Sequence, residues 1–274
     1  MGTFDLIEIV RGIHGFENTS TGLIVAILIV AALLVICAIV SVIVSIWLAI
    51  QYVRYNRTAN SCGMTGEQVA RRILDSNGLE HIKVKVTGSL LFGNSYSHYF
   101  KKVRLRRRTY KKQSVTSLAM AAQKSSLAIL DKEGDRDMKS RIRLTPVITF
   151  GPLAFVPMVV IGVVLDILIF KSIGVSTIIL TALGLAFYVF SFILSLRVLK
   201  TEVKAQNRAI EIVQKEGLAN GEEVEMMQKL FRLYNIEYVN DMVMAFLEMV
   251  YRILMILAQG QGGGNFSSGN SNSR

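Results

Sequence analysis

Residues 23–53 read LIVAILIVAALLVICAIVSVIVSIWLAIQYV, and this stretch decides the class of fold. It is 31 residues long, and Ser41, Ser45 and Gln51 are its only distinctly polar members. About 20 apolar residues are enough to cross the hydrocarbon core of a bilayer. A signal peptide has a shorter apolar region and a basic start. The run therefore predicts a retained transmembrane helix, which we assign to residues 21–53.

The composition of the whole chain agrees with a membrane protein. Hydrophobic residues make up 51% of the 274 residues. Charged residues make up only 19%, which is below the ~25% that is typical of soluble domains. The two cysteines, Cys37 inside the apolar run and Cys62 outside it, are not expected to meet. The sequence thus excludes a disulfide scaffold and indicates no cysteine metal site.

Further apolar blocks predict more membrane spans. Residues 147–170 and 173–196 are joined by a very short link, which predicts a transmembrane hairpin within 146–199. Residues 241–258 form either a fourth transmembrane helix or a helix on the membrane surface, and we favour the span. The predicted fold is mainly α: a multi-pass membrane protein with three to four transmembrane helices and a small α+β domain.

Charge predicts which parts face the cytoplasm. Residues 54–145 hold 20 Lys and Arg against 7 Asp and Glu. Because basic loops stay inside the cell, we expect 54–145 and the charged helices of 200–240 to be cytoplasmic parts of a cell-membrane protein. Residues 1–20 would then be extracytoplasmic. The Gly/Ser/Asn-rich residues 259–274 are predicted to be a disordered tail.

The basic region 54–145 has the local signals of a small folded domain. Thr65 and Gln68 match a helix-capping box, and Asn77-Gly78 is a typical helix end. Residues 81–87 and 101–106 alternate like strands. Residues 114–130, rich in Ala and Leu, predict another helix.

Residues 63–79, GMTGEQVARRILDSNGL, resemble the opening of the bacterial putative neutral zinc metallopeptidase family, whose members are YugP-like multi-pass membrane proteins. Weaker likenesses follow in the family's order at 94–105, 114–122 and 201–209. The likeness covers roughly residues 25–258. It implies that residues 54–145 form a domain resembling a degenerate zincin.

The positions where this sequence departs from the family imply that the zinc chemistry is lost. In the family, His-Glu-x-x-His follows an Ala-Ala pair; two His one turn apart bind zinc, and the Glu acts on the metal-bound water. Here residues 123–127 read QKSSL. Gln123 and Leu127 would take the ligand positions and Lys124 the general-base position, while Glu202 would keep the third ligand's residue type. Zinc is expected from the family, but its ligands are missing, so we expect neither a cofactor nor a catalytic residue.

Glu202 needs a partner for a reason that does not depend on the family. It falls on an apolar helical stripe that includes Val198, Leu199 and Ala205. A carboxylate buried alone costs several kcal/mol. We expect either that Lys124 supplies the opposite charge or that Glu202 reaches the edge of the stripe and is hydrated.

A second candidate site is the basic segment between residues 101 and 112. Three interpretations remain open: simple cytoplasmic retention, contact with anionic lipid headgroups, and binding of nucleic acid, which is the least favoured. Its cations are Lys101, Lys102, Arg104, Arg106, Arg107, Arg108, Lys111 and Lys112.

Three hypotheses for function follow. The first is a catalytically inactive, metallopeptidase-like membrane protein that acts as a binding, adaptor or regulatory component, with membrane lipids and a membrane protein or a second copy as partners. The second is an active but divergent metallopeptidase that uses other ligands, such as His81, His98 and Glu202. The third and weakest is a subunit of a transporter or channel.

Overall fold

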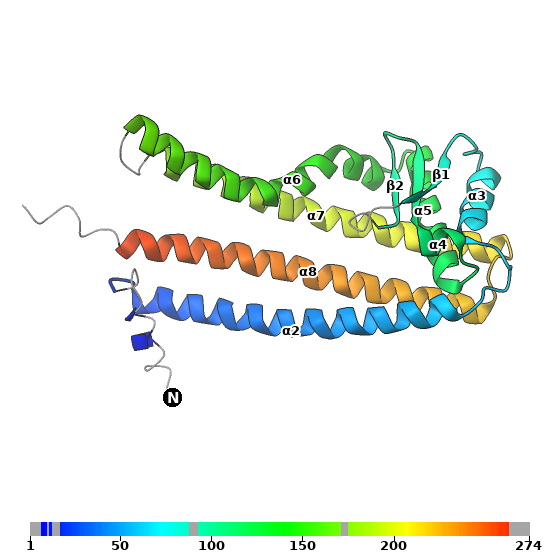
Figure 1. The fold of residues 1–274 in the computed structure, drawn as a ribbon, viewed down its shortest axis with the longest axis horizontal. Coiled ribbons are helices and arrows are strands. Elements are labelled where there is room, and N and C mark those ends of the chain that lie inside the picture. Colours follow the sequence, from blue (N-terminus) through cyan, green and yellow to red (C-terminus); the bar gives the residue numbers. More distant parts are fainter. Residues whose placement is uncertain (1–6, 10, 13–16, 88–92, 171–174, 263–274) are drawn as a thin grey trace, which may run out of the picture. The chain divides into compact units, whose positions relative to one another are not determined.

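A computed structural model describes residues 7–9, 11–12, 17–87, 93–170 and 175–262. Figure 1 shows that the described residues form long helices and one small sheet. They divide into two compact units, one of Met1–Val42 with Asn240–Arg274 and one of Ile43–Val239. The link between the predicted apolar blocks 147–170 and 173–196 lies outside the described residues, as do most of the predicted N-terminal segment and tail. The last helix reaches Gly262, however, so the first residues of the predicted tail are helical.

Helices make up most of the described chain. In chain order they are α2 (Thr21–Arg57), α3 (Gly66–Ser76), α4 (Arg107–Lys111), α5 (Val115–Lys132), α6 (Arg136–Leu165), the π-helical turn η1 (Asp166–Phe170), α7 (Val175–Lys215) and α8 (Gly221–Gly262). From Val175 onward, the predicted apolar block and the charged helix after it form one continuous helix, α7.

The sheet lies in the Ile43–Val239 unit and has three strands. They are β1 (Lys83–Thr87), β2 (Ser95–Ser97) and β3 (Lys102–Arg106), in the spatial order β1-β3-β2. β1 pairs with β3 in parallel, and β2 pairs with β3 in antiparallel. The strands predicted at 81–87 and 101–106 are therefore confirmed. β2 was not predicted, because three residues are too few to establish an alternating pattern.

The helix ends of this unit follow the predicted local signals. Thr65 accepts a hydrogen bond from the Gln68 backbone N–H (3.3 Å), and the Gln68 side chain accepts from the Thr65 backbone N–H (2.8 Å). This reciprocal pair is the predicted capping box of α3. Ser114 caps α5 in a similar way, through Ser117 N–H. Gly78 adopts φ 66° just past the end of α3, a conformation that glycine reaches without steric cost.

The core of this unit forms around α5. Its buried apolar side chains come from the last part of α2, from α3, α5 and β3, from the second half of α7 and from the first half of α8. Members with 2% exposure or less include Ile73, Leu74, Leu105, Leu118, Ile129, Val213, Met227 and Leu230. Because α5 is buried on nearly all sides, the polar side chains that it carries must find partners inside the protein.

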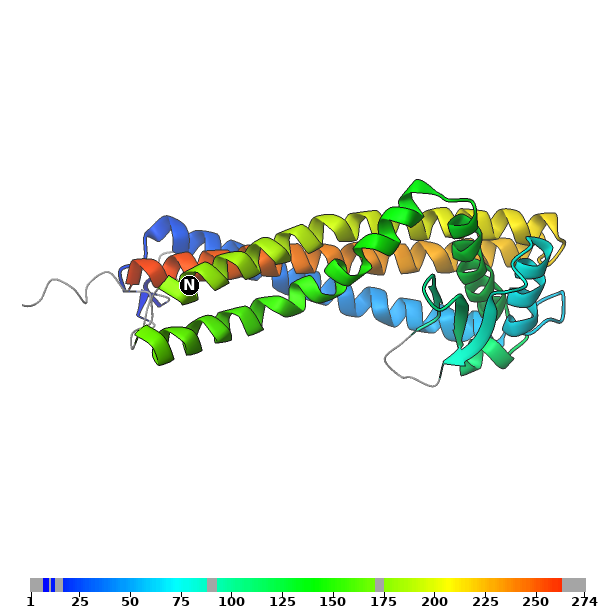
Figure 2. The same cartoon turned by 90° about the horizontal axis from the view of Figure 1, so that it is seen from above.

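α6 and α7 pack along each other (Figure 2). A Cβ added at Gly162 of α6 would lie only 2.7 Å from Thr177 Cα of α7, so the two backbones approach closely where a side chain is absent. The Ser191 hydroxyl of α7 also donates to the backbone oxygen of Val147 in α6 (2.9 Å).

Two of the described helices, α2 and α7, are long and apolar enough to cross a membrane. Their apolar side chains are largely exposed, for example Ile43 (57%), Trp47 (56%) and Ile178 (68%). A shorter apolar helical stretch runs over Leu153–Ile169. Residues 241–258, which we expected to be a fourth span, lie within α8, and α8 is not one of the two helices that meet this criterion.

Candidate functional site

The candidate site is centred on the carboxylate of Glu202 in α7. Its Oε2 accepts hydrogen bonds from Gln123 Nε2 (2.8 Å) and Lys124 Nζ (3.0 Å), both on α5. The Glu202 side chain is only 17% exposed and that of Lys124 only 12%. The Lys124–Glu202 pair that we expected from the sequence is therefore confirmed, and the hydrated alternative is wrong.

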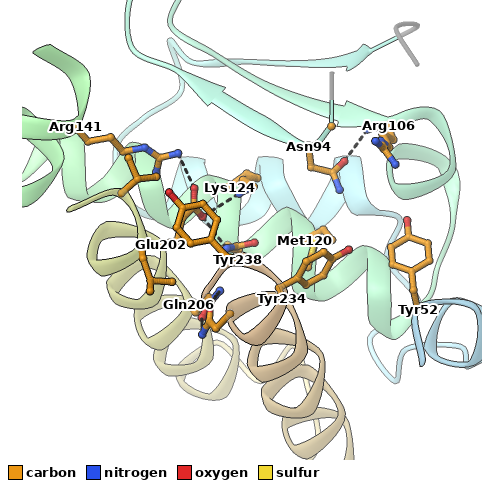
Figure 3. A pocket seen from close by; sticks show the side chains of 15 residues that line it. Tyr52, Asn94, Arg106, Met120, Lys124, Arg141, Glu202, Gln206, Tyr234 and Tyr238 are labelled. Carbon is orange, nitrogen blue, oxygen red and sulfur yellow. Dashed lines mark hydrogen bonds and ion pairs between the residues drawn. The ribbon is translucent and has the colours of Figure 1, made fainter. Parts of the chain in front are cut away.

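A second cation, which the sequence did not predict, completes this cluster. Arg141 Nη2 on α6 donates to Glu202 Oε1 at 2.6 Å (Figure 3). We call Gln123, Lys124, Arg141 and Glu202 the Glu202 cluster. Arg141 is 61 residues from Glu202 in the chain, and it is one of many basic residues before an apolar block. Only the packing of α6 on α7 distinguishes it from the others.

The Glu202 cluster forms part of the wall of a cavity of about 430 Å³ within the Ile43–Val239 unit. Three tyrosines also line it: Tyr52 of α2, and Tyr234 and Tyr238 of α8 (Figure 3). The Tyr238 hydroxyl donates to the backbone oxygen of Ser195 (3.0 Å). On another wall Gln206 and Asn235 exchange two hydrogen bonds of 2.9 and 2.8 Å, which tie α7 to α8. The remaining lining residues are Gly93, Asn94, Arg106, Met120, Val198 and Leu199.

The surroundings keep Glu202 ionised. Burial acts to raise the pKa of its carboxyl, but the charges and hydrogen bonds of Lys124 and Arg141 outweigh burial and lower the pKa from 4.5 to about 2. Glu202 lies beyond Leu196, where the apolar part of α7 ends. At neutral pH the cluster is thus one anion held between two cations.

Stability should depend on pH through this group. Between about pH 4.5 and pH 2 the unfolded chain binds a proton at Glu202 that the folded chain does not bind, so stability falls as pH falls. We expect a loss of about 2 kcal/mol between pH 5 and pH 3 from this residue. Thermal unfolding across this range measures the loss, and the Glu202→Gln variant should lack this part of the slope. An equal slope in the variant would assign the acid sensitivity to other carboxylates.

The residues at the positions implied by the family do not fit a zinc ion. Zinc in proteins is held by thiolate, imidazole or carboxylate donors. Of the four positions only Glu202 has such a group, and both of its oxygens already accept bonds from cations. The ammonium of Lys124 has no lone pair to offer, and Leu127 is 1% exposed in an apolar cluster with Ala205. In the described part of the chain, no group of three or more His, Cys, Asp and Glu residues is placed to hold a metal.

His98, one of the alternative zinc ligands, contacts Asp131 of α5 and not Glu202. Its Nδ1 lies 2.6 Å from Asp131 Oδ2, and the Tyr96 hydroxyl donates to the same oxygen at 2.6 Å. This cluster holds β2 and the turn after it on the C-terminal half of α5. His81 is exposed at the start of the segment that leads into β1.

The basic residues between positions 101 and 112 lie in several different environments. Lys102 and Arg104 lie over the exposed ring of Phe100, at 4.4 and 5.7 Å from its centroid. Lys101 lies 3.7 Å from Asp131. Arg106, Arg107, Arg108, Lys111 and Lys112 are all exposed, but of these five only Arg106 also lines the cavity. Residues 107–111 form the short helix α4, which no pattern in the sequence predicted.

Comparison with known proteins agrees with the resemblance seen at residues 63–79. The sequence profile of the family described as "Putative neutral zinc metallopeptidase" matches residues 30–257, and the chain belongs to this family. Among its relatives is the "Putative membrane protease YugP" of Bacillus subtilis (strain 168), which is 26% identical over 209 residues, or 76% of this chain and 87% of the relative. No solved structure matches the chain significantly. This relative and the two apolar helices indicate a membrane protein.

Proposed function

We propose that this chain is a catalytically inactive member of the family that acts as a binding, adaptor or regulatory component of a membrane assembly. The observation that carries the proposal is the Glu202 cluster. A zinc peptidase needs free donor lone pairs and a base at its metal. In this chain the one carboxylate is neutralised by Lys124 and Arg141, and a lysine ammonium stands beside it.

The proposal includes a topology in the membrane. Three or four helices cross it, and residues 54–145 and 200–240, which carry most of the charge, lie in the cytoplasm. The exposed apolar surfaces of α2 and α7 support the membrane spans. The domain resembling a zincin would then present its cavity on the cytoplasmic side, where lipids and a partner membrane protein or a second copy reach it.

Zinc content separates this proposal from its rival, a divergent active peptidase. We expect protein purified without chelators to contain far less than one zinc per chain and to leave peptide substrates intact. Installing the missing donors with Gln123→His, Lys124→Glu and Leu127→His should give a chain that binds about one zinc, since Glu202 would complete the ligand set. Elemental analysis measures both contents.

A melting experiment controls for the buried histidine that this variant introduces at position 127. Zinc should raise the melting temperature of the triple variant and leave that of the unaltered protein unchanged, because only a metal that binds the folded state stabilises it. Stoichiometric zinc in the unaltered protein, or zinc-dependent peptide cleavage by it, would overturn the proposal.

A further inference from the structure

The cavity beside the Glu202 cluster carries more positive than negative charge. Arg106, Lys124 and Arg141 line it, against the single carboxylate of Glu202. Three cations against one carboxylate leave two positive charges uncompensated, and Arg106 takes no part in the pairing of Glu202 with Lys124 and Arg141. Among the described residues, no carboxylate lies within ion-pair distance of the Arg106 guanidinium. The neighbouring residues 88–92, GSLLF, contain no acid either.

Unused hydrogen-bond donors accompany this charge. Arg141 donates through Nη2 to Glu202, but its Nη1 is buried and has no acceptor among the described residues. Buried donors in folded proteins almost always have a partner, so this nitrogen calls for a water or a ligand oxygen. Arg106 is held by its backbone N–H, which donates to Asn94 Oδ1 (2.7 Å), and its guanidinium stays available. Figure 3 shows Arg141 and Arg106 toward opposite sides of the cavity, with Lys124 and Met120 between them.

The cavity also lies where the apolar parts of α2, α6 and α7 end. Tyr52 stands at the end of the apolar run of α2, and Val198 and Leu199 lie just after Arg197, the first charged residue beyond the apolar part of α7. Arg141 lies in α6 shortly before its own apolar block. Its lining residues therefore come from the parts of these helices where apolar sequence changes to basic sequence. Its three tyrosines are of a residue type that is enriched at membrane interfaces.

We propose that this cavity binds the phosphate headgroup of an anionic membrane phospholipid. Guanidinium groups match phosphate oxygens in shape and charge, which gives Arg106 and the Nη1 of Arg141 an acceptor. Met120, Val198 and Leu199 would contact the glycerol and the first methylenes. A zwitterionic headgroup fits less well, because its cation would meet a wall whose one carboxylate is already neutralised. A cavity of about 430 Å³ is within the range of ligand pockets.

This inference rests on the proposed binding role of the cavity, but its test reads lipid binding and not zinc or peptidase activity. The probe is fluorescent phosphatidylglycerol, titrated with the full-length, delipidated protein in neutral detergent micelles and followed by anisotropy. Unlabelled phosphatidylglycerol should displace it at least about tenfold more strongly than phosphatidylcholine. Arg106→Gln should weaken binding at least about tenfold.

Arg108→Gln is the matched control, because it removes the same charge two positions away, outside the cavity, and should change binding by less than about twofold. Circular dichroism of both variants shows whether they fold. An equal loss in the two variants would overturn the proposal in favour of diffuse surface charge. Equal displacement by phosphatidylcholine would also overturn it. So would displacement by inorganic phosphate at the same concentration as the lipid, or by a peptide with a free terminal carboxylate but not by its amide.

Discussion

Replacing Glu202 by Gln should lower the free energy of unfolding by about 3–5 kcal/mol, the range for breaking a buried ion pair by removal of one partner. The side chain is 17% exposed and holds two cations, Lys124 at 3.0 Å and Arg141 at 2.6 Å. In the Gln variant both cations stay in the protein interior without an anion. The amide also turns donors toward them. Denaturant unfolding in detergent, followed by circular dichroism, measures the change.

Two further variants show whether charge is the cause. Glu133→Gln removes a carboxylate from the pair with Arg208, in which both side chains are well exposed (38% and 47%), so we expect a change of less than about 1 kcal/mol. Adding Lys124→Met and Arg141→Met to Glu202→Gln should recover much of the lost stability, because no charge then remains in the Glu202 cluster. A Glu202→Gln variant as stable as the Glu133→Gln control would show that water already screens this cluster.

Replacing Gly66 by Ala should cost about 3 kcal/mol or more, at the upper end of the range for overpacking. Gly66 is the first residue of α3, and its backbone N–H donates to the Lys112 oxygen at 3.2 Å. An added Cβ would overlap the backbone oxygen of Thr109 in α4. A backbone oxygen cannot turn aside as a flexible side chain can, so α3 and α4 must separate to admit the methyl group.

Gly221 provides the matched control for this prediction. It is also the first residue of a helix, α8, but an added Cβ there would meet nothing within 4 Å. Gly221→Ala should therefore be neutral or stabilise the protein by up to about 1 kcal/mol, since alanine restricts the unfolded chain. Thermal melting of the two variants compares them directly. Similar melting temperatures would mean that the close packing of α3 against α4 contributes little to stability.

Much of the local structure was predictable because its causes lie within a few residues of each other. The capping box of α3 needs only Thr65 and Gln68, and the Ser114 cap needs only the turn that follows it. Residues 101–106 alternate with period two, and β3 forms there. β2 and α4 escaped prediction because three and five residues are too few for a period to show.

The candidate site was predictable only in part. Glu202 falls on an apolar stripe, so its need for a cation follows from the cost of burying charge, and the resemblance to the family pointed to Lys124. Arg141 and the cavity were missed. The lining comes from α2, α5, α6, α7, α8, the end of β3 and the two residues before β2, and no local pattern records which residues these elements bring together.

From the amino-acid order alone follow the apolar helices, the family and the absence of a His-Glu-x-x-His motif, because hydropathy and motif spacing are properties of contiguous residues. The composition of the candidate site depends on how α5, α6 and α7 pack together. It places two cations on one carboxylate and leaves a third, Arg106, in the wall of the same cavity. Electrostatic energy depends on distances through space, and residues 61 positions apart in the chain approach to 2.6 Å only in the folded protein.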